Sequence, residues 1–360
     1  MFQYGIEHEV AFINSNGKFA DFTNTKFSEF QNIVDKLPFH ETDYPQLRVG
    51  DAGIKLKRWY VEGFERFSES AELTDCVPKG IEIRTTIHKN IHGAIEELNK
   101  SMQLLKNQAE LAGFTPVSLS FNPIQTKFNP FPPLNNYELK RRDGSPEKQT
   151  AHIPMLTYGP DLSISLASLS TQEIIDAGKK LTYYSPFIIP FSFSTPIEGG
   201  SNWKGYSYRT YVRTGIRPAV MVFLGKKENL ISSIPSLTQL ARVPAEAGRI
   251  EFKAFDSCSS FDIYASLLGL LKGIILDNSL SGSALIPDRN LHKLSAQEGF
   301  ENNIIFSQAW ETVQAAYRAL QNDPDQDLLI PLINRLENGR LALKKQPGSD
   351  KDHFKKTLKL

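Results

Sequence analysis

Three short segments of this 360-residue chain place a glutamate after an isoleucine, with a second charged residue two positions further on. They are Ile6-Glu7-His8-Glu9, Ile81-Glu82-Ile83-Arg84 and Ile250-Glu251-Phe252-Lys253. Each segment lies in an apolar, β-branched run of the kind that forms strands, and successive side chains of a strand point to opposite faces. The glutamate and the second charged residue of each segment therefore share one face. We interpret that face as the wall of a polar cavity.

Carboxylates gathered on one face repel one another unless cations compensate them. Arg84 and Lys253 supply part of the positive charge, and a divalent metal would supply the rest, because oxygen ligands suit Mg²⁺ or Mn²⁺. The candidate metal ligands are Glu7, Glu9, Glu82 and Glu251. An ordinary antiparallel sheet with one face in water would show the same alternation. The recurrence of glutamate in three segments favours the cavity.

The segment 199–218 is a second candidate site, because Arg209, Arg213 and Arg217 recur there every fourth residue among glycines and aromatics. Arginine pairs bidentately with carboxylate or phosphate, so the segment could clamp a nucleotide or an acidic substrate. The alternative is an exposed helix face with its arginines in solvent. Interleaved aromatics would also suit single-stranded nucleic acid. The formal net charge of +1 argues against a nucleic-acid or membrane partner.

Other common catalytic motifs are missing from the sequence. It contains no P-loop or Rossmann glycine signature, no Gly-x-Ser-x-Gly elbow and no zinc-type histidine spacing. His8 falls on the strand face opposite Glu7, which predicts a packed histidine. Cys76 and Cys258 show neither metal spacing nor a disulfide framework, which favours a reducing, cytoplasmic compartment. We expect Cys258 to be a buried structural thiol. We also expect no signal peptide and no transmembrane segment.

Hydrophobic periodicity predicts the elements that position these residues. The predicted strands are 1–15, 77–87, 117–121, 161–166 and 247–257. The predicted helices are 91–112, 170–184, 261–276, 303–320 and 328–343, the second opening on a Ser170–Glu173 capping box. Residues 123–150 read as a long loop, and such loops often act as lids or binding loops. Strands and helices mix without βαβ regularity, so the fold class is α+β with an antiparallel sheet.

The domain prediction follows from the same pattern. The 40% hydrophobic and 22% charged composition is that of a globular protein. Residues 1–300 are predicted to form one catalytic α+β domain. Residues 301–360 are predicted to form a C-terminal helical segment packed on it, with a basic tail from Lys344.

Four motifs in order carry a resemblance to a known family. They are Gly5-Ile6-Glu7-x-Glu9, Glu82-Ile83-Arg84-Thr85, Ser207-Tyr208-Arg209 and Arg249-Ile250-Glu251-Phe252-Lys253-Ala254-Phe255-Asp256. Their order and spacing resemble the glutamate–cysteine ligase superfamily, in particular the family 2 carboxylate–amine ligases, over roughly residues 4–280. The resemblance implies a glutamine-synthetase-like catalytic fold, in which a curved antiparallel sheet with flanking helices forms a funnel around Mg²⁺ ions.

The resemblance also implies a reaction. ATP would phosphorylate the side-chain carboxylate of glutamate, and an amine would then displace the phosphate from the γ-glutamyl phosphate. In the namesake enzymes the amine is cysteine and the product serves glutathione biosynthesis. The partners implied are thus small molecules: ATP with Mg²⁺ or Mn²⁺, glutamate, and an amine or amino acid.

Roles implied by position agree with the face argument. Glu7, Glu9, Glu82 and Glu251 match the metal ligands. Lys253 stands where relatives commonly have Arg, and would contact the transferring phosphate. Arg209 resembles the arginine that holds substrate carboxylate or phosphate, and Asp256 matches an acid that follows the third motif. The residues expected at substrate or nucleotide are Arg84, Arg209, Arg213, Ser163 and Ser165.

Two departures from the family pattern keep other hypotheses open. Many relatives have His-x-His where this chain has Ser163 and Ser165, and His-Pro where it has Asn122-Pro123. Water or Asp161 could replace a lost imidazole ligand. The alternatives to a glutamate–cysteine ligase-like enzyme are a ligase for another acid or amine, and a non-catalytic relative that binds nucleotide or amino acid.

Overall fold

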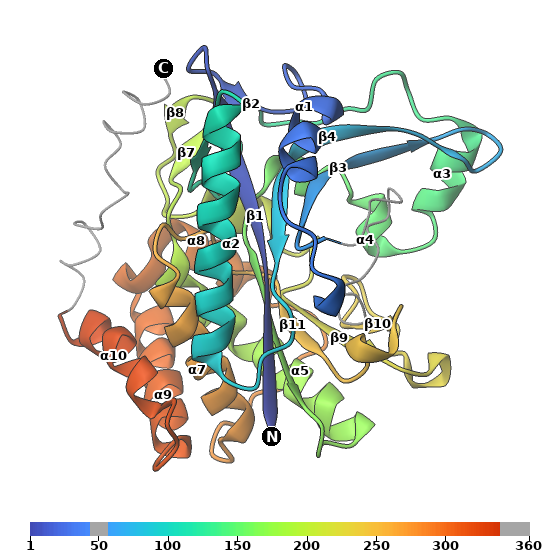
Figure 1. Ribbon diagram of the computed structural model, residues 1–360. Coiled ribbons are helices and arrows are strands. Elements are labelled where there is room, and N and C mark those ends of the chain that lie inside the picture. The colour runs from blue at the N-terminus through green and yellow to red at the C-terminus, as the bar shows by residue number, and fades with distance from the viewer. Residues whose placement is uncertain (44–56, 339–360) are drawn as a thin grey trace.

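A long central strand, β1, organises the sheet of the computed structural model, which describes residues 1–43 and 57–338 (Figure 1). The strand order of the described sheet is β10-β9-β11-β6-β1-β4-β3, and β2 and β5 pair with the far end of β1. All pairings are antiparallel except that of β9 with β10. The strands are β1 (Phe2–Asn14), β2 (Phe19–Ala20), β3 (Trp59–Phe67), β4 (Leu73–Arg84), β5 (Phe114–Val117), β6 (Pro160–Leu166), β9 (Val220–Leu224), β10 (Thr238–Leu240) and β11 (Ile250–Phe252).

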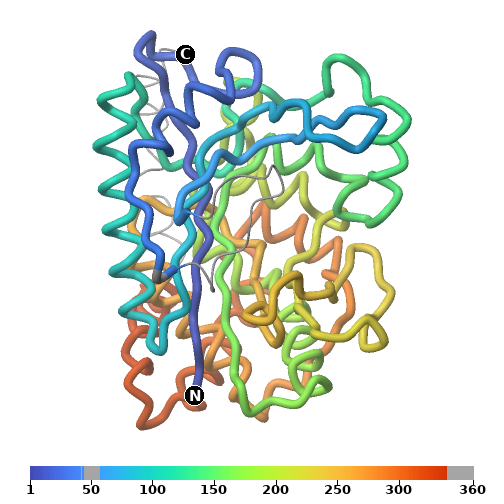
Figure 2. Tube along the Cα trace, turned by 45° about the vertical axis from the view of Figure 1, so that its right-hand side comes forward, coloured from blue at the N-terminus to red at the C-terminus, as the bar shows by residue number. Residues whose placement is uncertain are grey.

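Different helices lie on the two sides of the long strand β1. Helices α2, α7 and α9 lie together on one side of β1, whereas α3 and α4 lie on the other (Figure 1). The β3–β4 hairpin reaches beyond the sheet and lies beside α3 (Figure 2). The helices are α1 (Phe27–Asp35), α2 (Ile91–Leu111), α3 (Asn136–Arg142), α4 (Pro146–Gln149), α5 (Thr171–Ile188), α6 (Tyr208–Arg213), α7 (Asp262–Leu276), α8 (Arg289–Glu298), α9 (Asn303–Ala319) and α10 (Ile330–Glu337). Two short strands, β7 (Ile197–Glu198) and β8 (Ser201–Asn202), pair separately.

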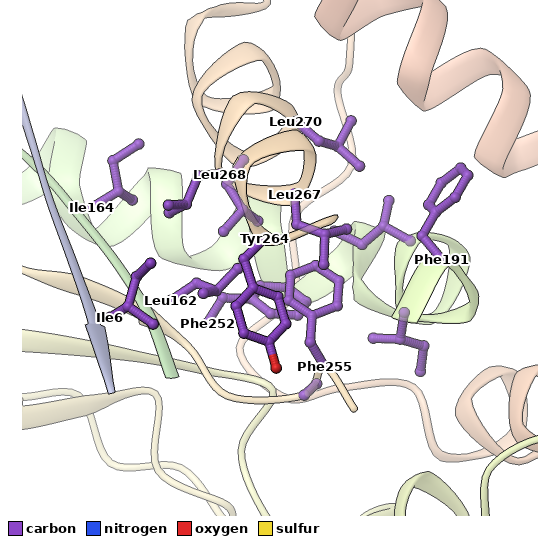
Figure 3. Packing of buried hydrophobic residues seen from close by; sticks show 14 of the residues in the cluster. Ile6, Leu162, Ile164, Phe191, Phe252, Phe255, Tyr264, Leu267, Leu268 and Leu270 are labelled. Atoms are coloured by element: carbon purple, nitrogen blue, oxygen red, sulfur yellow. The ribbon is translucent and has the colours of Figure 1, made fainter. Parts of the chain in front are cut away.

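The apolar strand residues between the charged ones form the core. Ile6, Leu162 and Phe252 come from neighbouring strands and lie beside Tyr264 and Leu267 of α7 (Figure 3). All five side chains are buried. Burying such side chains stabilises the fold by roughly 1.5–3 kcal/mol each. This packing turns the alternate, charged positions of the same strands toward the opposite face.

The C-terminal helices pack on the same core. Helix α9 contacts α5 and α7, and Ile305 and Val313 belong to the main hydrophobic cluster. The division of the chain near residue 300 stays a prediction. The basic tail from Lys344, and the part of the predicted last helix beyond residue 338, lie outside the described residues.

Two element predictions were wrong and others shifted at their ends. The strand expected at 117–121 ends at Val117, and Phe121 makes only an isolated bridge to Thr157. The expected loop 123–150 contains α3 and α4, whose first turns are capped by Asn135 and Ser145. Such side-chain caps allow short helices inside a segment rich in Pro and Asn. The third glutamate strand, β11, spans only residues 250–252. The Ser170–Glu173 capping box is confirmed.

Candidate active site

The charged face of the sheet borders a cavity of about 1090 Å³. Strands β1, β3, β4, β6, β9 and β11 contribute one part of its lining. Segment 134–157 and residues 209–218 contribute another. Parts of the expected long loop 123–150 and of the candidate clamp segment 199–218 thus border this cavity.

One carboxylate cluster joins three strands at the centre of the sheet. Glu7 of β1 lies opposite Asp161 of β6, and Glu251 of β11 lies opposite Ser163 of the same strand. One carboxylate oxygen from each of Glu7, Asp161 and Glu251 lies within 4.8 Å of the other two. Asp161 was considered from the sequence only as a substitute for a missing imidazole.

A second carboxylate cluster lies further along β1. Glu9 is opposite Glu82 of β4, and Glu62 of β3 completes a group whose oxygens also lie within 4.8 Å of one another. Glu82 is 5% exposed, and its Oε1 has no hydrogen-bond partner among the described residues. Burial, followed by Glu7, Glu62 and Glu9, raises the pKa of Glu82 well above its usual range. A buried, unpartnered carboxylate oxygen beside two other carboxylates is a good fit for a cation.

The four glutamates predicted as one ligand set are thus divided between two clusters. Each cluster gains a carboxylate, Asp161 in the first and Glu62 in the second. The only signal available for Glu62 was weak: in an extended run it would share a strand face with Tyr60 and Phe64. Both donor sets consist of oxygen alone, which suits Mg²⁺ or Mn²⁺.

Lys253 lies in the first cluster, on the face it was predicted to share with Glu251. Its Nζ is 3.1 Å from Glu251 Oε1 and is hydrogen-bonded to Asp161. Burial by itself would lower the pKa of Lys253, but Asp161, Glu251 and Glu7 raise it above its ordinary value. The ammonium is therefore charged at neutral pH.

Arg249 adds a second cation to the same cluster. It was not among the site residues predicted from the sequence. Its guanidinium is 3.4 Å from Glu7 and 3.6 Å from Glu251. It also pairs with Glu246 at 3.5 Å and stacks on the Phe223 ring at 4.2 Å. The motif Arg249-Ile250-Glu251 was the available signal, because Arg249 and Glu251 share a strand face.

The arginines of segment 199–218 do not form an exposed helix face. Arg209 and Arg213 are buried, Arg217 is partly buried, and all three line the cavity. Arg209 and Arg213 donate to the main-chain oxygen of Lys253 at 3.1 and 3.0 Å. Burial, together with Arg209 and Arg217, lowers the pKa of Arg213. Three crowded guanidinium groups on a cavity wall favour an anion.

Arg209 is held by the residues around it. Asp256 is fully buried, accepts a hydrogen bond from Ser207 at 3.0 Å and lies 3.9 Å from Arg209. Burial raises the pKa of Asp256 to about 6, an effect that Arg209 opposes. Asp256 is absent from the cavity lining, so its contact with Arg209 is a positioning contact. The Nε of Arg209 is buried and has no hydrogen-bond partner among the described residues.

Gly159 lies between Glu9 of the second carboxylate cluster and the guanidinium of Arg209. A Cβ at this position would lie 2.5 Å from the guanidinium of Arg209, which is closer than any real contact. Its N–H donates to Glu9 Oε2 at 3.0 Å. The position therefore needs glycine for a close approach rather than for a turn.

The remaining predicted substrate residues lie at a smaller cavity of about 60 Å³. Its lining includes Arg84, Ser163 and Ser165, and it shares Glu7 and Arg249 with the large cavity. Ser163 is buried, and its Oγ has no hydrogen-bond partner among the described residues. Arg84 stacks on the Tyr60 ring at 4.3 Å.

Three other residues have structural roles. His8 is buried against Phe261 at a ring distance of 5.0 Å, and burial lowers its pKa to about 4. Cys258 donates to Ser192, and burial raises the pKa of its thiol. The prediction for His8 is confirmed, whereas Cys258 is only partly buried. Asn122, the second departure from the family pattern, is buried and donates to Asp21 at 2.6 Å, away from the cavity lining.

No protein-family model and no curated protein matches the chain. Solved structures do. A glutamate–cysteine ligase from Francisella tularensis in complex with AMP aligns with 99% of this chain and 87% of its own, at a TM-score of 0.53 and 12% identity. The ligase PafA, in complex with the ubiquitin-like protein Pup, aligns with 100% of this chain and 69% of its own, at a TM-score of 0.50 and 10% identity. A bifunctional glutathione synthetase from Pasteurella multocida has a TM-score of 0.54 and 10% identity, over 99% of this chain and 52% of its own.

The chain shares its overall fold with these ligases. The predicted class, a glutamine-synthetase-like curved antiparallel sheet with flanking helices, is confirmed by these alignments. At 10–12% identity the likeness concerns the fold alone. No helix in residues 1–43 and 57–338 is long and apolar enough to cross a membrane.

Proposed function

We propose that this chain is an ATP- and divalent-metal-dependent carboxylate–amine ligase, which activates glutamate and joins it to a small amine or amino acid. The observation that carries the proposal is the distribution of charge in the large cavity. Two clusters of three carboxylates line it together with Arg209, Arg213, Arg217 and Lys253.

This distribution of charge suits a nucleoside triphosphate with its metal ions. Clustered carboxylates favour bound cations, and the unpartnered oxygen of Glu82 supports a cation here. The arginines need anions, and phosphate oxygens satisfy the fork of donors on a guanidinium. A nucleotide bound through divalent ions would meet both requirements at once. The structure of the Francisella ligase with AMP supports a nucleotide in this fold.

The residues of the two clusters would hold the metal ions. Glu9, Glu62 and Glu82 form one donor set, and Glu7, Asp161 and Glu251 form the other. When bound, divalent ions would neutralise the phosphate oxygens and make transfer to an anionic carboxylate possible.

The reaction would take place in two balanced steps. A carboxylate oxygen of glutamate would form a bond to the γ-phosphorus of ATP as the bond to ADP breaks. The amine nitrogen would then form a bond to the acyl carbon, phosphate would leave with the carboxylate oxygen, and the amine would lose a proton. Lys253 and Arg209 would stabilise the negative charge that builds up on the transferred group and on the tetrahedral adduct.

The smaller cavity would receive the polar end of the acid. Arg84 and Arg249 supply cationic groups there, and Ser163 supplies a buried hydroxyl. Because Glu7 and Arg249 line both cavities, the acid would extend from the small cavity toward the phosphates in the large one.

An ADP-release assay tests the proposal. Purified protein is incubated with Mg·ATP, glutamate or another acid, and a panel of amino acids and amines, with Glu251→Gln as the inactive control. ADP release that requires both an acid and an acceptor would support the ligase, and the acceptor that gives the highest rate would define its specificity. Nucleotide binding without turnover on every pair would instead support the non-catalytic alternative.

A further inference from the structure

Lys79 is a buried ammonium at the second carboxylate cluster. Its side chain is 1% exposed, and its Nζ donates to Glu9 Oε1 at 2.5 Å. Two further bonds run to the main-chain oxygens of Pro154 and Thr157, each at 2.8 Å. These bonds use all three N–H groups of the ammonium, so its position is fixed. The Nζ also lies 5.2 Å from the centre of the Tyr158 ring.

Glu9 is held from both sides as a result. Lys79 binds one carboxylate oxygen, and the N–H of Gly159 binds the other at 3.0 Å. Glu9 thus keeps one orientation, with its oxygens within reach of Glu62 and Glu82. A carboxylate fixed in this way is preorganised to bind a cation.

The negative charge of this cluster favours a cationic side chain such as Lys79 beside it. Glu9, Glu62 and Glu82 bring three carboxylates together at the cavity, and the Oε1 of Glu82 has no hydrogen-bond partner among the described residues. Arg84 also acts on Glu82, but it is stacked on Tyr60. Lys79 is hydrogen-bonded directly to Glu9 of this cluster.

We propose that Lys79 is an internal cation that holds the Glu9–Glu62–Glu82 cluster together before metal binds, and that it positions Glu9 for the metal. The inference rests on the proposed function, because it assumes that the cluster binds a divalent ion. Lys79 and the ion then share the task of neutralising the carboxylates. Removal of Lys79 should make the protein depend on the ion for its stability.

Thermal unfolding of Lys79→Met, with EDTA or with about 10 mM MgCl₂ and no nucleotide, tests the proposal. In EDTA the variant should melt roughly 4–7 °C below the wild type, because the partly buried carboxylate of Glu9 and the main-chain oxygens of Pro154 and Thr157 lose their partner. Mg²⁺ should recover more than half of that loss, and so raise the Tm of the variant by more than that of the wild type. The control is Lys57→Met. Lys57 donates to main-chain oxygens of Val34, Asp35 and Leu37, so Mg²⁺ should not recover its loss.

The outcomes separate the two proposals. If Mg²⁺ raises the Tm of neither the wild type nor Lys79→Met, the cluster is not a metal site and that part of the proposed function fails. If Mg²⁺ raises both by the same amount, Lys79 is only an anchor for the chain near Pro154, and the inference is overturned. If Lys79→Met does not fold, the double variant Lys79→Met/Glu9→Gln should fold, because the uncompensated charge is gone. Failure of the double variant to fold also overturns the inference.

Discussion

Replacing Lys253 with alanine should affect both the chemistry and the stability of the protein. The ammonium is 3.1 Å from Glu251 and is hydrogen-bonded to Asp161, within the first carboxylate cluster. It lies on the same cavity wall as Arg209, whose guanidinium donates to the main chain of Lys253. Lys253 is thus a counter-ion of this cluster, and we propose that it also contacts a phosphate.

The two roles predict different magnitudes. Loss of a preorganised charge at the transition state costs a factor of about 10² in kcat, or about 2.7 kcal/mol. An interaction made mainly in the transition state leaves the KM for ATP nearly unchanged. The side chain is only 19% exposed, so loss of its two ion pairs should also cost about 3–5 kcal/mol of stability in metal-free protein. Lys253→Arg should keep most of the activity and the stability, since it retains the charge.

Steady-state ADP release at saturating Mg·ATP, on protein shown by circular dichroism to be folded, measures kcat and KM. Lys148→Ala is the control, because Lys148 is an exposed lysine at the rim of the same cavity, and its kcat should change less than about threefold. If folded Lys253→Ala keeps a kcat within about threefold of the wild type and loses only thermal stability, Lys253 is a counter-ion and its catalytic role must be abandoned.

Three further predictions follow from the same cavity. Burial and the nearby Glu7 raise the pKa of Glu82, so the folded protein retains a proton that the unfolded chain releases, and the stability of the metal-free protein should fall as the pH rises above about 4.5. Glu82→Gln should flatten this pH dependence in thermal melts and abolish stabilisation by Mg²⁺. An unchanged pH profile in the variant would contradict a raised pKa at Glu82. Gly159→Ala should push Arg209 out of place and lower kcat/KM at least tenfold in the ADP-release assay, whereas activity near that of the wild type would mean that Arg209 has room to move. Amide hydrogen exchange in segments 123–150 and 199–218 should slow when Mg·ATP is added, and equal exchange with and without the nucleotide would rule out a clamp.

The face on which the glutamates lie could be predicted from the sequence. Strand alternation has a fixed period of two, so Glu7 and Glu9 had to share a side once residues 1–15 were assigned to a strand. The buried partners Ile6 and Ile83 determined which side is the core. By the same alternation, Lys253 was correctly predicted to lie beside Glu251.

The grouping of the carboxylates could not be predicted, because it depends on pairing between distant strands. Nothing local indicates that Glu7 lies opposite Asp161, or that Glu9 lies opposite Glu82. Register of this kind is set by the packing of whole strands. Glu62 was missed because its strand, β3, carries no isoleucine–glutamate motif.

The burial and contacts of the cationic side chains could not be predicted for a different reason. Lys79 follows a proline and precedes a glycine, and the sequence does not show that it is buried against main-chain oxygens from the 154–157 turn. The burial of Arg209 likewise depends on the close approach of Gly159, a contact between residues far apart in the chain. Chemical groups that act through tertiary contacts leave no periodic signal in the sequence.

Oxygen transfer from the acid to phosphate is a direct test of ligation through an acyl phosphate. Glutamate labelled with ¹⁸O in its side-chain carboxylate is incubated with the protein, Mg·ATP and hydroxylamine as a small amine, and the released phosphate is examined by mass spectrometry. A ligase that forms an acyl phosphate transfers a carboxylate oxygen to phosphate, so we expect ¹⁸O-labelled phosphate in proportion to the ADP formed. ADP formation with unlabelled phosphate would mean that water attacks ATP directly, and would contradict the assignment of this cavity to a carboxylate–amine ligase.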